Sequence, residues 1–219
     1  MGEIGVYEAM RTLRAVRRLR PDPIPADVLE RVIEAATWAP TGGNAQPWRV
    51  VVVRDAAEKQ RLGGLYAERW RAYSERHRLL VADAPEAAKE AAARMLRSGD
   101  HLASNFAATP AVLVFCFNPK NMALTDAAQD RPSVVGGASV YPAVQNLLLA
   151  CRAEGLGCVL TTLLCEVEPA VRALLEIPEP WATACAVPVG WPRGRGHGPL
   201  SRRPVEKMAF ADRFGSPLA

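Results

Sequence analysis

The chain has 219 residues, of which 49% are hydrophobic and 23% are charged, and its formal net charge is +4. This length allows one large domain or two small ones, and the apolar content is ordinary for a globular protein. The charge is too small to indicate a nucleic-acid-binding protein, and no run approaches the roughly 18 apolar residues of a membrane helix.

The cysteines and the N-terminus indicate the cellular compartment of the protein. The five cysteines are Cys116, Cys151, Cys158, Cys165 and Cys185. An odd number without close pairs argues against a disulfide framework and for a reducing compartment. The charged N-terminus lacks the apolar segment of a signal peptide. We therefore expect a cytoplasmic protein, with Cys151, Cys158 and Cys165 in its core.

The first helix is predicted over residues 3–20 and ends before Pro21. Its arginines at three- and four-residue spacings would share one side of the helix; they are Arg11, Arg14, Arg17 and Arg18. This side has two interpretations. One interpretation is a solvated basic helix end, where positive charges interact favourably with the C-terminal end of the helix dipole. The other is a phosphate clamp, because the planar guanidinium matches phosphate oxygens.

A second helix is predicted over residues 26–38, and a loop rich in glycine and amides follows it. Gly42 and Gly43 lack a Cβ, so the backbone there can turn tightly and approach a ligand closely. Asn44 and Gln46 each offer a donor and an acceptor. The loop therefore suits a flat heterocycle with alternating N–H and C=O groups, although an ordinary loop with two surface amides has the same composition.

A short strand at residues 50–53 precedes a predicted helix from 55 to about 65, and residues 66–97 are charged and alanine-rich. Aromatic side chains recur here at helical spacing, at Tyr66, Trp70, Tyr73 and His77. They form either a face that packs on the core or on another chain, or a wall of a substrate pocket. Residues 83–97 are polar enough for us to expect a mobile segment.

The second half of the chain alternates strands and helices. The expected elements are a strand at 111–117, a loop at 118–134, an apolar helix at 139–154 capped by Gly155, a short strand at 158–163, a helix at 168–175 and a strand at 183–190. No repeat or change of composition divides the chain. The alternation predicts one α+β domain over residues 1–219, with a mixed, largely antiparallel sheet covered by helices.

Two segments carry a resemblance to a known family. The pattern A-P-T-x-x-N-x-Q-P-W at residues 39–48, preceded by the cluster of arginines, resembles the nitroreductase family of FMN-dependent oxidoreductases. The segment V-G-G-A-S-x-x-P-A-V at residues 135–144 resembles the core helix of that family. The resemblance implies a domain-intertwined homodimer, in which part of the first loop reaches a flavin bound mainly by the other subunit.

The resemblance also implies the residues that bind FMN, and they fall in three groups. They are Arg14, Ala15, Arg17, Arg202 and Arg203 at the phosphate, Pro40, Thr41, Gly42, Asn44 and Gln46 in the loop, and Thr161, Thr162 and Leu163 along the flavin ring. The Thr162 backbone N–H is the expected donor to flavin N5. The family usually has R-S-x-R where this chain has Ala15 in place of serine. One phosphate hydrogen bond must therefore come from elsewhere, or the affinity drops.

The resemblance implies a function as well. FMN would carry a hydride from NAD(P)H to an electron-poor acceptor, a nitroaromatic, a quinone, an enone or a small aldehyde, by a ping-pong mechanism. We identify no catalytic side chain and no metal ligands, because a cofactor can supply the chemistry. The family also implies a variable insertion at about 66–108, which shapes the substrate pocket, and a C-terminal arm at 208–219.

Three alternatives remain open. The protein is either a specialised flavin enzyme that reduces a C=C bond, dehalogenates its substrate or fragments flavin, or a flavin-binding protein without catalysis, or a nucleic-acid binder that uses its arginines. We expect no nucleic acid and no membrane among its partners.

Overall fold

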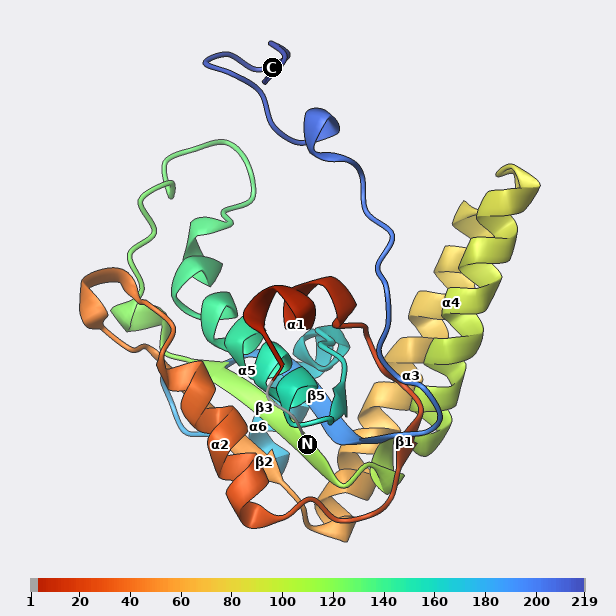
Figure 1. The fold of residues 1–219 in the computed structure, drawn as a ribbon. Helices are drawn as coiled ribbons and strands as arrows, with labels where there is room; N and C mark the ends of the chain where they lie inside the picture. The colour runs from red at the N-terminus through yellow and green to blue at the C-terminus, as the bar shows by residue number, and fades with distance from the viewer. Residues whose placement is uncertain (1–3, 219) are drawn as a thin grey trace.

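A five-stranded sheet forms the centre of the computed structural model, which describes residues 4–218 (Figure 1). Its strands are β1 (Leu19–Arg20), β2 (Trp48–Val53), β3 (Ala111–Phe117), β4 (Gly157–Cys158) and β5 (Ala182–Pro192). They lie in the order β1-β5-β3-β2, with β4 also paired to β5, and every strand pair is antiparallel. One isolated parallel bridge joins Ala15 to Cys158. The predicted α+β fold is confirmed.

Helices cover both faces of this sheet. They are α1 (Val6–Thr12), α2 (Ala26–Thr37), α3 (Ala56–Leu80), α4 (Glu86–Asn105), α5 (Tyr141–Ala153) and α6 (Glu168–Leu174). One cluster of buried side chains includes residues of α2 and α5, and the other includes residues of α3, α4 and α6. Within residues 4–218 no helix is both long and apolar enough to cross a bilayer.

Strand β3 shows why the apolar run at residues 111–117 predicts a strand that is buried on both faces. Successive side chains of a strand point to opposite faces of the sheet. Leu113 and Phe115 therefore pack in the layer of α2 and α5, whereas Val112 and Val114 pack in the layer of α3. All four are at most 1% exposed. The predicted strand and its burial on both faces are confirmed.

The prediction of one helix over residues 3–20 is wrong across the part that the structure describes. Helix α1 ends at Thr12, and the chain after it is extended. The Val16 N–H donates to the Cys158 carbonyl at 2.9 Å, and the buried side chains of Val16 and Leu19 lie against Gly157. These apolar residues bring the segment onto the sheet edge, where it forms β1. Residue 3 lies outside the described residues.

Helix α3 is also longer than predicted, since it continues from residue 65 to Leu80. Gly63 does not end it, because this residue packs closely against Phe106 and Ala107. Tyr66 is 2% exposed and stacks on Phe106 with ring centroids 4.6 Å apart. The packing interpretation is confirmed for Tyr66 and for the buried Trp70. Most of the segment expected to be mobile, residues 83–97, lies in α4.

The short strand expected at 158–163 is only partly formed. Strand β4 ends at Cys158, and Thr161 then exchanges backbone hydrogen bonds with Ala186 at 2.9 and 2.8 Å. A 3-10 helix begins at Leu163. The chain therefore leaves the sheet after Thr161, and the backbone of Thr162 makes no hydrogen bond to β5.

The cysteines are all free, and four of them are buried, while Cys165 is half-buried. The expected core position is confirmed for Cys151 and Cys158, whereas Cys165 is only partly buried. Gly155 has φ of 76° and ends α5 as predicted.

The contact between α3 and α4 at Gly99 gives a first prediction. A Cβ added at Gly99 would lie 2.0 Å from the Trp70 ring. The Trp70 indole is held by a 2.7 Å hydrogen bond to Asp100. We expect Gly99→Ala to lower the free energy of unfolding by about 1–3 kcal/mol, because the helices must separate to admit the methyl group. Denaturant titration measures this change.

Gly64 is the matched control for Gly99, because it lies in α3 of the same helix pair and its Cβ would meet open space. Gly64→Ala should stabilise the protein by about 0.5–1 kcal/mol through helix propensity. Equal effects of the two substitutions would contradict the packing account.

Candidate functional site

Two of the predicted arginines meet in one surface recess, although they come from opposite ends of the chain. Arg14 and Arg202 line a hollow of about 500 Å³ together with Ala15 and Ser201. Both guanidinium groups are exposed, and a guanidinium binds phosphate oxygens in pairs. We call this hollow the arginine recess. Arg203 is exposed in the same tail but does not line it.

Hydrogen bonds of His197 connect the tail after β5 with the segment of Arg14, and both segments line the arginine recess. Its Nε2 lies 2.8 Å from the Leu156 carbonyl, which can only accept, so Nε2 carries the proton. Its Nδ1 then accepts from the Arg14 backbone N–H at 3.4 Å. Next to it, the Gly198 N–H donates to the Thr12 carbonyl at 3.0 Å. No pattern in the sequence indicates this role, because the partners of His197 lie far from it in the chain.

The burial of His197 predicts a pH dependence of stability. Burial lowers the pKa of His197 below its usual 6.5, and the charge of Arg152 lowers it further, while the Leu156 carbonyl partly opposes both. The unfolded chain then binds a proton more readily than the folded one, so this stability is present above about pH 6.5 and is lost as the pH falls. We expect the free energy of unfolding to decrease from pH 7 to pH 5.

The substitution His197→Gln tests this assignment, because glutamine does not titrate in this range. The difference in unfolding free energy between the wild type and this variant should shrink as the pH falls. A constant difference across the range would show that His197 does not titrate with folding.

A second group of predicted residues continues from the arginine recess along the sheet edge. The bridge between Ala15 and Cys158 aligns residues 14–17 with the segment that carries Thr161, Thr162 and Leu163. Burial raises the pKa of Tyr66, and the Thr161 hydroxyl and the Arg17 charge both act against this rise. Arg17 and Thr161 therefore lie near the same buried phenol.

The predicted loop at residues 40–46 is a tight turn with unusual backbone angles. Gly43, Asn44 and Gln46 have φ of 58°, 54° and 46°, and such values are uncommon for residues other than glycine. The Thr41 hydroxyl accepts from the Gln46 N–H at 3.0 Å, and the Ser139 hydroxyl accepts from the Gly42 N–H at 3.1 Å. Strained backbone of this kind clusters at ligand sites.

Arg49 supports the same loop from β2. Its Nη1 donates to the carbonyls of Gln46 at 3.2 Å and Trp48 at 2.7 Å, and its guanidinium lies 5.1 Å from the centre of the Trp181 ring. The side chains of Asn44 and Gln46 remain exposed. The loop is thus a fixed turn that presents two amides to the outside of the domain.

The structure does not bring this loop to the arginine recess. In Figure 1 the loop after α2 lies on one side of the domain, and the segment between α1 and β1 lies on the opposite side. Within one chain the predicted residues thus form two groups. Pro40, Thr41, Gly42, Asn44 and Gln46 make up one, and the residues along the recess and the sheet edge make up the other.

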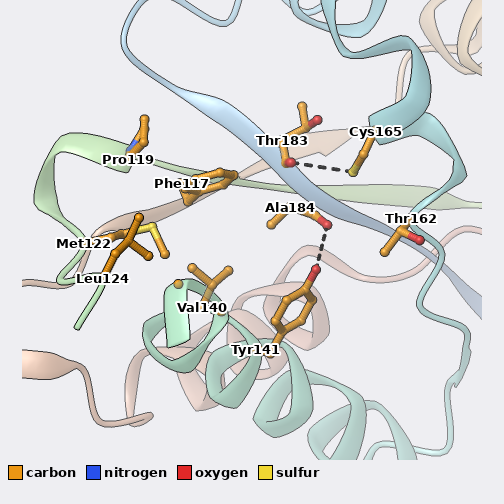
Figure 2. Close-up of a pocket in the computed structure, with 12 residues that line it drawn as sticks. Phe117, Pro119, Met122, Leu124, Val140, Tyr141, Thr162, Cys165, Thr183 and Ala184 are labelled. Carbon is orange, nitrogen blue, oxygen red and sulfur yellow. Dashed lines mark hydrogen bonds between the residues drawn. The ribbon is translucent and has the colours of Figure 1, made fainter. Parts of the chain in front are cut away.

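An apolar pocket of about 370 Å³ lies beside Thr162 (Figure 2). The end of β3, the loop after it, the start of α5, the start of β5 and the 3-10 helix after Thr162 line it. Asp126 holds this loop, because it accepts hydrogen bonds from Ser133 at 2.6 Å and from Arg131 at 2.7 Å. These partners keep the pKa of Asp126 below its usual value. We call this cavity the Thr162 pocket.

The polar groups of the Thr162 pocket are few, and most are engaged. The Tyr141 hydroxyl donates to the Ala184 carbonyl at 3.1 Å, and the Cys165 thiol donates to the Thr183 carbonyl at 3.5 Å. Burial raises the pKa of both the phenol and the thiol. No acid, base or activated nucleophile is evident among the lining residues. The pocket suits a reaction whose chemistry a cofactor carries.

Comparisons with known proteins identify the family of this chain. A model described as the nitroreductase family matches residues 10–191. The chain is 33% identical over 189 residues to the 5,6-dimethylbenzimidazole synthase of Rhodospirillum rubrum, covering 82% of this chain and 78% of that protein. It is 31% identical over 204 residues to the NADH dehydrogenase of Thermus thermophilus, covering 90% and 91%.

A solved structure also shares the fold. An iodotyrosine deiodinase bound to FMN and 3-iodo-L-tyrosine is similar at a TM-score of 0.68 and 22% identity. The match covers 97% of this chain and 100% of that one.

Proposed function

Because the chain belongs to the nitroreductase family, we propose that it is an FMN-dependent oxidoreductase. Bound FMN would supply hydride transfer from NAD(P)H to an electron-poor acceptor such as a nitroaromatic, a quinone or a small carbonyl compound. The two substrates would use the same space in turn. The observation that carries this proposal is the convergence of Arg14 and Arg202 on one recess, where Ala15 is bridged to Cys158, three residues before Thr161.

The arginine recess fits the FMN phosphate. Arg14 and Arg202 would bind its oxygens, with Arg17 and Arg203 adding positive charge nearby. Ala15 lines the recess but has no hydroxyl to donate. Ser201 lines the same recess, so its hydroxyl can replace the one that Ala15 lacks.

The backbone at Thr162 fits the flavin ring. The Leu163 N–H donates to the Thr161 hydroxyl at 3.4 Å, and the Thr161 N–H donates to the Ala186 carbonyl of β5. The Thr162 N–H has no hydrogen-bond partner within residues 4–218. It is therefore the donor that we assign to flavin N5, where it would stabilise the reduced ring.

A homodimer accounts for the separation of the two groups of residues. The loop at residues 40–46 would reach a flavin held mainly by the recess of the partner subunit. The tail after β5 extends away from the domain (Figure 1), and the exposed fractions of Met208 and Phe214 within it are 66% and 96%. Apolar side chains this exposed are typical of an interaction surface. We propose that this arm packs on the partner.

A specialised flavin reaction is the second candidate function. It is favoured by the relative named 5,6-dimethylbenzimidazole synthase, which is as similar to this chain as the relative named NADH dehydrogenase. Ordinary reduction and a specialised reaction share the same FMN site.

The test is anaerobic mixing of the purified protein with NADH or NADPH. We expect one of them to bleach the yellow absorbance of the flavin, and a quinone added afterwards to restore it. If neither nicotinamide bleaches a bound flavin, the reductase proposal fails and flavin binding without catalysis remains. If the protein carries no flavin and retains RNA in a salt-sensitive manner, it is a nucleic-acid binder.

A further inference from the structure

We propose that His197 is a positioning residue for the FMN phosphate. In its neutral form it holds Arg14 against the tail that carries Arg202, and the arginine recess binds the phosphate tightly only while His197 is neutral. The inference rests on the proposed function and adds a control of cofactor affinity by pH. The residue that exerts this control does not itself line the recess.

The arginine recess has two walls that belong to distant segments of the chain. Arg14 and Ala15 come from the segment after α1, whereas Ser201 and Arg202 come from the tail after β5. A phosphate bound by both guanidinium groups needs them at a fixed separation, because each presents its N–H groups in one plane. The affinity of the recess therefore depends on the contacts that hold the two walls together before the ligand arrives.

Contacts of His197 and of the residue after it hold these walls together. The His197 Nδ1 accepts from the Arg14 N–H at 3.4 Å, and its Nε2 donates to the Leu156 carbonyl at 2.8 Å. The Gly198 N–H donates to the Thr12 carbonyl at 3.0 Å. The Arg14 guanidinium lies beside Gly198, since a Cβ added there would be 3.7 Å from its Nη1. The tail therefore contacts both the backbone and the guanidinium of Arg14.

Protonation of His197 breaks the contact with Arg14. An imidazolium has two N–H groups and no acceptor. Its Nδ1–H would face the Arg14 N–H, so two donors would oppose each other where a hydrogen bond now exists. The ring and the Arg14 backbone must then separate, and the guanidinium of Arg14 moves relative to that of Arg202.

The charges around His197 do not stabilise its protonated form. The cations on the segments that surround it are Arg14, Arg152, Arg195 and Arg202. Burial lowers the pKa of His197, and the charge of Arg152 lowers it further. The carboxylates on the adjoining helices are engaged elsewhere, because Glu8 pairs with Arg11 and Glu154 pairs with Arg31. Within residues 4–218 no carboxylate bonds to His197 that could hold the imidazolium in place.

A charge on His197 would also attract a phosphate, and this effect has the opposite sign. However, His197 is only 8% exposed, and both of its ring nitrogens are directed at backbone groups. A phosphate in the recess therefore gains no hydrogen bond from the imidazolium, whereas it loses the alignment of Arg14 with Arg202. We expect the loss of alignment to dominate, so that FMN affinity falls as the pH falls.

The experiment titrates the flavin-free protein with FMN at about pH 8 and at about pH 5.5, followed by flavin fluorescence. Between these values the Kd of the wild type should rise by about 2- to 10-fold more than the Kd of His197→Gln, because only the fraction with neutral His197 binds well. The FMN phosphate itself titrates with a pKa of about 6, but it does so equally for both proteins. His77→Gln in α3 is the matched control and should follow the wild type.

Two further measurements distinguish positioning from a purely structural role. His197→Ala loses both hydrogen bonds of the ring and should weaken FMN binding at about pH 8 by about 3- to 30-fold. His197→Gln keeps a donor and an acceptor and should recover most of this loss. Riboflavin has no phosphate, so its Kd should change with pH by the same factor in the wild type and in His197→Gln.

Three results would overturn the inference. The first is an identical pH dependence of the Kd for FMN in the wild type and in His197→Gln. The second is tighter binding of FMN by the wild type, relative to this variant, as the pH falls. The third is an equal dependence on His197 for riboflavin and FMN, since the histidine would then support the fold and not the phosphate site. In all three cases FMN binding at about pH 8 would still support the proposed function, whereas its absence would refute both.

Discussion

Arg14→Ala is expected to raise the dissociation constant for FMN by about 10- to 150-fold. A hydrogen bond to a charged group contributes about 1.5–3 kcal/mol, and every 1.4 kcal/mol is a factor of ten. Arg14 lines the recess with Arg202, and its backbone is held by His197, so the lost guanidinium has no replacement at that position. Titration of the flavin-free protein with FMN, followed by flavin fluorescence, measures the change.

Two variants serve as controls for Arg14. Arg11 is paired with Glu8 on α1 and does not line the recess, so Arg11→Ala should leave the FMN affinity unchanged. Ala15→Ser restores a hydroxyl in the recess and should tighten binding by about 2- to 10-fold. If Arg11→Ala weakened binding as much as Arg14→Ala, the effect would be one of net charge, and the recess would not be the phosphate site.

Phe115→Ala is expected to lower the free energy of unfolding by about 3–5 kcal/mol. Phe115 is completely buried in the central strand β3, and its ring centre lies 5.7 Å from that of Trp48. The substitution leaves a cavity between the sheet and α5, which the rigid strands on both sides cannot fill. Denaturant unfolding with an unchanged m-value measures this loss.

The matched control for Phe115 is Phe214 in the C-terminal arm, which is 96% exposed. Phe214→Ala should change the unfolding free energy of the isolated chain by less than about 0.5 kcal/mol. A loss below about 1 kcal/mol for Phe115→Ala would contradict the position of this ring in a closely packed core.

Elements buried on both sides could be predicted from the sequence. The strand at residues 111–117 and the apolar helix that begins near Pro142 are specified by their own side chains, because each must be covered wherever it lies. The turn at Gly43 could also be predicted, since glycine adopts its φ of 58° readily.

Elements that depend on a distant partner could not be predicted. Residues 13–20 have a helical pattern of arginines, but Val16 and Leu19 find an apolar surface at Gly157, and the backbone pairs with Cys158. The helix predicted to end near residue 65 continues, because Gly63 packs against Ala107 and Tyr66 packs against Phe106. Both outcomes depend on contacts between segments far apart in the chain.

The site was predictable only in part. The residues Arg14 and Arg202 came from a resemblance, and no local pattern connects them. The roles of His197, Arg49 and Ser139 carry no signal in the sequence, because each acts on the backbone of a remote segment. Only the folded chain brings these side chains to the segments that they hold.

The central claim is that two guanidinium groups and the backbone at Thr162 hold FMN. The most direct test is the absorption spectrum of the purified protein after incubation with FMN and removal of the excess, followed by chromatography of the released chromophore. We predict a yellow protein that releases FMN in proportion to its concentration. A protein that stays colourless after this treatment would contradict the account.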